Sequence, residues 1–203
     1  ISKKEDIDFI TRAFNYANEK HAGQVRKSGE PYINHCLSVA YILATYQSAP
    51  ATIAAGFLHD TLEDCGVSYQ EIRTLFNDDV AEIVQAVKKN KNLPNVSLEE
   101  TSASTHRKLI LAMAKDIRAV IVKLCDRLHN MRTLQYVKPH KQIETSKETL
   151  EVYAPLAHRL GMSNIKNELE NLCLYYLKSK EFDIVDSLVN ERLAKHQFDI
   201  DEI

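Results

Sequence analysis

Apolar residues recur every three or four positions along most of the chain, which is the spacing that places them on one face of an α-helix. Ile7, Ile10, Phe14 and Ala17 show this pattern near the N-terminus, and Gly23 is suited to end that helix. We find no useful run with the alternation of a half-buried strand, and no internal repeat. The pattern therefore predicts an all-α protein. Its helices are expected near residues 5–21, 35–43, 55–64, 68–76, 80–87, 116–131, 143–150, 165–176 and 182–189.

The stretch from Gly56 to Asp64 gathers several chemically active side chains on one of these helices. His59 and Asp60 are adjacent, and Glu63 and Asp64 follow one helical turn later, so each of the first pair lies near one of the second. An imidazole and three carboxylates at the border of an apolar face need a cation or protons to be tolerable. The alternative is an ordinary amphipathic helix with an acidic polar side, and this stretch alone does not decide between the two.

Two loops stand out between the predicted helices. Residues 22–34 contain helix breakers, and Arg26, Lys27 and Ser28 stand together there. Adjacent cations usually face solvent, but an arginine can also clamp a phosphate and stack on a nucleobase. Residues 88–105 are polar and unpatterned, and we expect a long mobile loop there.

The helix that follows Asp116 separates apolar from polar positions. Asp116 is suited to cap it, and Asp126, Asn130 and Thr133 fall on the face opposite its apolar stripe. The default for such a polar face is contact with water. Further along the chain, Pro155 is expected to kink or end a later helix.

Composition limits the classes of function. The chain has 203 residues, 44% of them hydrophobic, with only 5 glycines and 5 prolines, which fits long helices with few tight turns. A net charge of −2 gives no general attraction to nucleic acid, so we expect no DNA or RNA partner and only a local anion site. No apolar run approaches the roughly 20 residues of a membrane span. Four scattered cysteines without a CxxC pair indicate reduced thiols in a cytoplasmic protein.

Three of these regions together offer a candidate set of metal ligands. His35, His59, Asp60 and Asp126 supply two imidazoles and two carboxylates. This mixed nitrogen and oxygen set suits Mn, Fe or Zn better than Ca. Adjacent side chains point about 100° apart on a helix, so His59 and Asp60 could touch one ion only if the helix runs beside it.

The order of histidine, histidine-aspartate and aspartate is similar to the pattern of the HD metallophosphohydrolase superfamily. The pair HD alone is a weak motif, but its surroundings are more specific. The chain closely resembles the hydrolase domain of the RelA/SpoT-homologue family in residues 26–35 (RKSGEPYINH), 57–64 (FLHDTLED), 123–134 (KLCDRLHNMRTL) and 153–161 (YAPLAHRLG). This resemblance weakens in the loop at 88–105, and Cys36 stands where that family commonly has proline.

This resemblance implies a single compact multi-helix hydrolase domain over residues 1–203. The implied reaction removes pyrophosphate from the 3′ position of the guanosine alarmones ppGpp and pppGpp, uses one Mn²⁺ ion, and terminates the stringent-response signal. The implied residues are His35, His59, Asp60 and Asp126 for the metal, Glu63 and Asp64 for catalysis, and Arg26, Lys27, Ser28, Asn130 and Thr133 for the nucleotide.

Two other functions stay open at this point. One is a catalytically silent domain that binds nucleotide for regulation, against which the acidic pair at residues 63–64 argues. The other is an HD phosphohydrolase for a different nucleotide, against which the basic run at residues 26–28 argues less strongly. Long members of the family carry synthetase and regulatory domains after this one, so residues from about 178 to 203 could lead into a synthetase domain.

Overall fold

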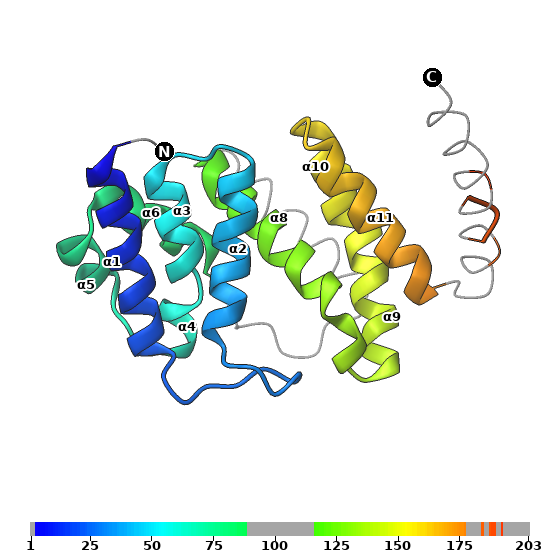
Figure 1. Ribbon diagram of the computed structural model, residues 1–203, viewed down its shortest axis with the longest axis horizontal. Helices are drawn as coiled ribbons and strands as arrows, with labels where there is room; N and C mark the ends of the chain where they lie inside the picture. Colours follow the sequence, from blue (N-terminus) through cyan, green and yellow to red (C-terminus); the bar gives the residue numbers. More distant parts are fainter. Residues whose placement is uncertain (1–2, 89–115, 178–183, 185–186, 190–191, 193–203) are drawn as a thin grey trace, which may run out of the picture. The chain divides into compact units, whose positions relative to one another are not determined.

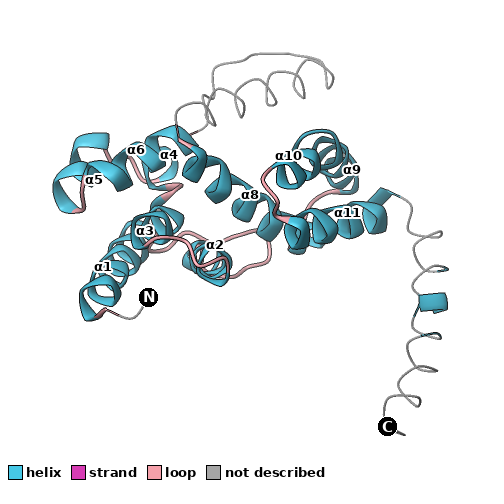
Figure 2. Ribbon diagram, turned by 90° about the horizontal axis from the view of Figure 1, so that it is seen from above, coloured by secondary structure: helices cyan, strands magenta, loops and turns pink. Residues whose placement is uncertain are grey.

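The computed structural model describes residues 3–88, 116–177, 184, 187–189 and 192. Within these residues every regular element is helical, and the β-type pairing is an isolated bridge between Val25 and Pro31 (Figure 2). The prediction of an all-α fold is therefore confirmed. No helix in this part of the chain is long and apolar enough to cross a membrane. Residues 89–105 of the expected mobile loop lie outside the described residues.

The chain divides into two compact units, Ile1–Val137 and Lys138–Ile203, and each is described by itself. The single domain expected over residues 1–203 stays a prediction. The first unit contains every residue that the sequence places in the site. Its helical elements are α1 (Lys4–Lys20), α2 (Ile33–Thr45), α3 (Pro50–Leu58), α4 (Thr61–Asp64), α5 (Tyr69–Leu75), α6 (Asp78–Val87), α8 (Ile117–Arg132) and the 3₁₀ turn η1 (Leu134–Tyr136).

Helix α3 is the centre of the first unit. Pro50 lies in its first turn, where a missing N–H costs little, and all residues from Thr52 to Leu58 are buried. The helix packs against α1, α2, α6 and α8, and Figure 1 shows α1, α2 and α3 side by side. Because α3 is apolar on all sides, it carries the polar residues that follow its last turn into the interior of the unit.

Gly56 permits a close approach between α2 and α3. A β-carbon at this position would lie 2.5 Å from Cδ1 of Leu43 and 3.4 Å from the α-carbon of Ala40. Both neighbours are buried on α2, so a side chain here would force rearrangement of the packing. The contact therefore fixes the separation between His35 on α2 and His59 just after α3.

Short polar side chains start three helices of the first unit. Asp116 caps α8 by accepting a hydrogen bond from the amide of Arg118 at 2.8 Å, as expected. Ser68 and Asn77 cap α5 and α6 in the same way, with bonds of 3.1 and 2.9 Å. Nη2 of Arg118 also donates to Asp79 at 3.0 Å, which ties the start of α8 to α6.

The second unit consists of α9 (Pro139–Glu148), the π-helical turn η2 (Thr149–Tyr153), α10 (Ala154–Arg159) and α11 (Ser163–Leu177). Pro155 lies in the first turn of α10 directly after η2, and it has no N–H to donate back into that turn. The expected disturbance at Pro155 thus takes the form of a π-turn. Gly161 adopts a φ of +71° and ends α10. Of the helix expected near 182–189, residues 184 and 187–189 are helical, and the rest lies outside the described residues.

Candidate metal centre

The helix predicted over residues 55–64 is interrupted at the residues that carry its chemistry. Helix α3 ends at Leu58 and α4 begins at Thr61, so His59 and Asp60 form a turn, and the prediction of a continuous helix is wrong. The hydroxyl of Thr61 donates to the carbonyl of Leu58 at 2.7 Å and supports this turn. As a result, Nε2 of His59 lies 2.9 Å from Oδ2 of Asp60. Adjacent side chains that would diverge by about 100° on a helix meet here.

Four side chains from three segments converge around one point. Nε2 of His35, on α2, lies 3.3 Å from Nε2 of His59 and 3.4 Å from Oδ1 of Asp126, on α8. The same Asp126 oxygen lies 4.0 Å from Nε2 of His59, and Oδ2 of Asp60 lies 3.7 Å from Nε2 of His35. His35, His59 and Asp126 are buried, and their donor atoms lie within 4.8 Å of one another. The fold thus brings together three of the four side chains expected to bind metal, and the fourth, Asp60, lies beside the two histidines.

The chemistry of these donors fits one small divalent cation. Nδ1 of His59 lies 2.9 Å from the carbonyl oxygen of Gly56, which can only accept, so Nδ1 carries the hydrogen and Nε2 of the neutral ring presents a lone pair. That lone pair faces a second imidazole nitrogen and two carboxylate oxygens, an arrangement that positive charge must stabilise. Donor atoms about 2.1 Å from one ion lie at most about 4.2 Å apart. The separations among His35, His59 and Asp126, 3.3 to 4.0 Å, meet this limit, as do those of Asp60 from the two histidines.

Burial and charge oppose each other at this centre. Burial lowers the pKa of His35, whereas at His59 burial is outweighed by the carboxylates of Asp60 and Asp126, which raise the pKa. Burial alone would raise the pKa of Asp126, but Lys123 and the two histidines hold that pKa well below its usual range. Burial would likewise raise the pKa of Asp60, but the neighbouring His59 outweighs burial and lowers that pKa. Both carboxylates are therefore ionised at neutral pH and require positive or hydrogen-bonding partners.

Helix α8 surrounds the carboxylate of Asp126 with donors. Nζ of Lys123 lies 2.6 Å from Oδ2, and Nδ2 of Asn130 donates to Oδ1 at 2.6 Å. Asp126 is 4% exposed, so the default that this polar face meets water is wrong for it. Asn130 is half-buried, and the hydroxyl of Thr133 donates to the carbonyl of His129 at 3.1 Å.

The basic loop before α2 reaches the same helix. Nη2 of Arg26 donates to Oδ1 of Asn130 at 2.7 Å, and Asn130 donates to Asp126, so hydrogen bonds connect the loop to the carboxylate. Gly29, at a φ of +87°, permits the turn in which the amide of Arg26 donates to the carbonyl of Glu30 at 2.9 Å. Arg26 is therefore held against α8, and its side chain is half-buried rather than fully solvated.

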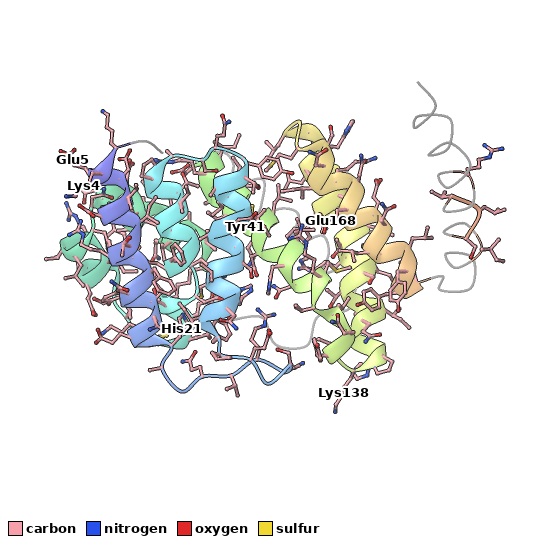
Figure 3. The ribbon with its side chains drawn as sticks, in the orientation of Figure 1. Lys4, Glu5, His21, Tyr41, Lys138 and Glu168 are labelled. Carbon is pink, nitrogen blue, oxygen red and sulfur yellow. The ribbon has the colours of Figure 1, made fainter. Side chains whose placement is uncertain are left out.

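Tyr32 links the basic loop to the other carboxylate. Its hydroxyl donates to Oδ2 of Asp60 at 2.6 Å, and this is the oxygen that faces His59. Its ring stacks on His21, with centroids 4.7 Å apart, and the guanidinium carbon of Arg26 lies 5.8 Å from its centroid. Figure 3 shows His21 at the end of α1, beside the loop that leads to α2. Stacking thus orients the tyrosine that orients Asp60.

Four other residues expected in the site lie on the basic loop and on α4. Lys27 is exposed, and the hydroxyl of Ser28 donates to a carboxylate two residues later at 3.5 Å. Glu63 and Asp64 end α4, and their amides donate to the carbonyl of Asp60 at 3.1 and 2.9 Å. Glu63 is half-buried and Asp64 is exposed. The roles expected for these four side chains stay predictions.

The sequence pattern does not single out Tyr32, Lys123 or His129. The last two flank Asp126 at i−3 and i+3 on α8, and that spacing is a signal that could have found them. Nδ1 of His129 lies 2.8 Å from Nδ1 of His35, and burial is the main reason that the pKa of His129 falls to about 3. Tyr32 gives no comparable signal, because a loop tyrosine reveals nothing about a partner distant in sequence.

Known proteins resemble the chain over most of its length. The model of the HD domain family matches residues 13–163. A GTP pyrophosphokinase of Myxococcus xanthus is 45% identical over 195 residues, which are 95% of this chain and 26% of that protein. The bifunctional (p)ppGpp synthase/hydrolase SpoT of Escherichia coli is 42% identical over 186 residues, which are 92% of this chain and 26% of that protein. The chain thus spans about a quarter of the length of these curated relatives.

A solved structure shares the fold. It is described as a metazoan ortholog of SpoT that hydrolyzes ppGpp and plays a role in starvation responses. It matches with a TM-score of 0.62 and 27% identity, covering 81% of this chain and 93% of that chain. The expected resemblance to a multi-helix hydrolase domain of the RelA/SpoT type is confirmed.

The buried ion pair between Lys123 and Asp126 leads to a test of stability. In protein stripped of metal, we expect Lys123→Met to lower the free energy of unfolding by about 3–5 kcal/mol, because it leaves a buried carboxylate without its cation. Lys166 pairs with Glu170 on α11 in a more exposed setting, so Lys166→Met should cost less than about 1 kcal/mol. Denaturant unfolding with a chelator measures both variants. Equal decreases in the free energy of unfolding would show that burial does not strengthen the contribution of the pair between Lys123 and Asp126.

Proposed function

The chain belongs to the HD domain family, and on this premise we propose that it hydrolyses ppGpp and pppGpp with water to GDP or GTP plus pyrophosphate. The observation that carries the proposal is the buried cluster of His35, His59 and Asp126, with Asp60 beside it. The substrate is supported by similar proteins, one named a (p)ppGpp synthase/hydrolase and one described as hydrolyzing ppGpp. The name GTP pyrophosphokinase belongs to a relative of which this chain covers only 26%.

His35, His59, Asp60 and Asp126 would hold one Mn²⁺ ion. Mixed nitrogen and oxygen donors favour Mn, Fe or Zn over Ca, and Mn also suits the hard oxygens of a pyrophosphate. When bound, such an ion polarises a phosphoryl oxygen and lowers the pKa of water from 15.7 to roughly 7. The protein's part is to keep the donors in place, as the bond from His59 to the Gly56 carbonyl does.

Glu63 and Asp64 are proposed to position the attacking water and to accept its proton. They follow the turn at residues 59–60 by one helical turn, on the short helix α4. The proposed ligand set does not include them, so we assign the role of base to their carboxylates. The water oxygen would form a new bond to phosphorus as the bond from phosphorus to the 3′ oxygen breaks. The water would give its proton to a carboxylate oxygen, and the leaving 3′ oxygen would take up a proton to become a hydroxyl.

The basic loop is proposed to hold the nucleoside end of the substrate. Arg26, with its planar donor fork, could stack on the guanine or bind phosphate, and Lys27 and Ser28 stand beside it. Asn130 lies on α8 and Thr133 directly follows that helix, and Asn130 already contacts Arg26 at 2.7 Å. In this arrangement the loop selects the nucleotide, and the metal residues act on its 3′-pyrophosphate.

Turnover and metal content test the proposal directly. We expect pyrophosphate release from ppGpp that is faster with Mn²⁺ than with Mg²⁺ or Ca²⁺, and faster than from other guanine nucleotides. His59→Ala removes a donor from the cluster and should lose both bound Mn²⁺ and turnover. His158→Ala changes an exposed histidine of the second unit and should keep both. Full Mn²⁺ content and activity in His59→Ala would rule out the assigned centre, while metal binding without turnover would favour a silent nucleotide-binding domain.

Glu63→Gln combined with Asp64→Asn separates catalysis from metal binding. The double variant keeps the shapes of both side chains but removes the base, so we expect hydrolysis slower by about 10²–10⁴-fold. Folding, Mn²⁺ content and ppGpp binding should be retained. Near-normal hydrolysis would mean that the pair only faces solvent. Loss of Mn²⁺ together with activity would make the two residues ligands or supports of ligands instead.

Arg26→Ala tests the nucleotide side of the site. In the slow double variant, where ppGpp persists, removing the guanidinium should weaken ppGpp binding by about 10-fold or more, since a charged hydrogen bond contributes about 1.5–3 kcal/mol. Arg26→Lys keeps the charge but not the planar fork and should recover only part of the affinity. Calorimetric titration measures affinity, with Arg159→Ala, on the exposed face of α10, as control. Unchanged affinity and Mn²⁺ content in Arg26→Ala would assign this loop to the solvated surface.

A further inference from the structure

A second histidine pair lies behind the candidate metal centre. The imidazole of His35 has one nitrogen, Nε2, among the other candidate ligands, and its Nδ1 lies 2.8 Å from Nδ1 of His129. The two ring centroids are 4.8 Å apart, with the planes tilted by 52°. His129 comes from α8, three residues after Asp126, so this helix carries both a candidate ligand and a contact to a candidate ligand on α2.

The hydrogens of this group of rings can be assigned from their partners. Two ring nitrogens 2.8 Å apart must share one hydrogen, because two lone pairs at that distance would repel. Nδ1 of His59 donates to the Gly56 carbonyl, so with a cation bound, which takes the place of a proton on Nε2, this nitrogen presents its lone pair to the cluster. The nearest oxygen to Nε2 of His35, Oδ1 of Asp126 at 3.4 Å, is also an acceptor.

Metal binding selects one of the two tautomers of His35. A histidine that binds an ion through Nε2 must present its lone pair there and carry its hydrogen on Nδ1. In this structure the hydrogen on Nδ1 of His35 can be donated only to His129 among the contacts that the described residues give that atom. His129 must then accept through Nδ1 and carry its own hydrogen on Nε2.

We propose that His129 is a positioning residue of the metal centre, which accepts a hydrogen bond from Nδ1 of His35 and so orients Nε2 of His35 toward the ion. Ligand histidines usually donate to a carboxylate, a backbone carbonyl or water. A neutral imidazole performs this role without adding a third negative charge to a centre that already contains Asp60 and Asp126. The proposal depends on the metal part of the proposed function and not on the identity of the nucleotide.

Matched substitutions can isolate the acceptor atom. Asparagine has its amide at the same distance from Cβ as Nδ1 of histidine, so His129→Asn can present a carbonyl oxygen to His35. Glutamine places its amide one bond further out, and phenylalanine keeps a ring but has no acceptor. His140→Phe, at an exposed histidine of the second unit, controls for the loss of a surface imidazole.

Mn²⁺ affinity, measured by competition with a chelator and without nucleotide, is the first measurement. We expect His129→Phe to bind Mn²⁺ about 10–100-fold more weakly, His129→Gln to be weakened, and His129→Asn to stay within about 3-fold of the unchanged protein. Equal affinity in the phenylalanine variant and the unchanged protein overturns the proposal. If the phenylalanine variant does not fold, equal affinities of the asparagine and glutamine variants overturn it in the same way.

Nitrogen NMR of the imidazoles supplies a second measurement, which a merely structural role would not move. In unchanged protein loaded with Zn²⁺, a diamagnetic ion that the same donors suit, we expect the hydrogen of His35 on Nδ1 and the hydrogen of His129 on Nε2, which leaves Nδ1 of His129 as the acceptor. A hydrogen on Nδ1 of His129 in the Zn²⁺-loaded unchanged protein would contradict the proposal, because that nitrogen could then not accept from His35. If the unchanged protein binds Mn²⁺ but does not hydrolyse ppGpp, the proposed function is overturned, whereas the assignment of His129 still stands on the Mn²⁺ affinities of the variants.

Discussion

Two carboxylates held among buried imidazoles are the constraint on which the rest of the first unit depends. Removing ionised groups from water is costly unless each finds a partner. The structure supplies these partners individually: Tyr32 for Asp60, and Lys123 with Asn130 for Asp126. Lys123 binds the Asp126 oxygen that is not shared with the histidines, whereas Tyr32 and Asn130 donate to the same oxygens that face them. The same contacts thus stabilise the two buried carboxylates and hold them in position for a cation.

The backbone around Gly56 serves this constraint twice. The absent side chain lets α2 approach α3, which brings His35 close to His59. The carbonyl of the same residue accepts the hydrogen of the His59 ring and turns its other nitrogen toward the cluster. A single glycine therefore influences both the separation and the orientation of two candidate ligands, although it carries no functional group.

Much of the fold follows from periodicity, because a helix buried on one face repeats its apolar residues every three or four positions. The break at His59 and Asp60 could not be foreseen in this way, since the polar turn continues the helical spacing on both sides. Burial of Asp126 was also hidden, because a polar face reads the same whether it meets water or a buried cluster. The order of histidines and aspartates suggested the metal ligands, and the family resemblance assigned them as such. The contacts of Tyr32 and His129 depend on tertiary packing, which no local pattern records.

The contact between Arg26 and Asn130 has a consequence for recognition. In the structure described here the guanidinium is already engaged, at 2.7 Å, by an amide that also holds Asp126. A visiting anion that takes over the guanidinium must replace this internal partner, and a charged hydrogen bond of this kind is worth about 1.5–3 kcal/mol. The Asn130 amide thus competes with any ligand for the Arg26 guanidinium. A ligand that offers a single weak contact gains little binding free energy, while one that offers several acceptors at once can displace the amide. Such competition sharpens discrimination between rich and poor ligands without adding any contact to the better one.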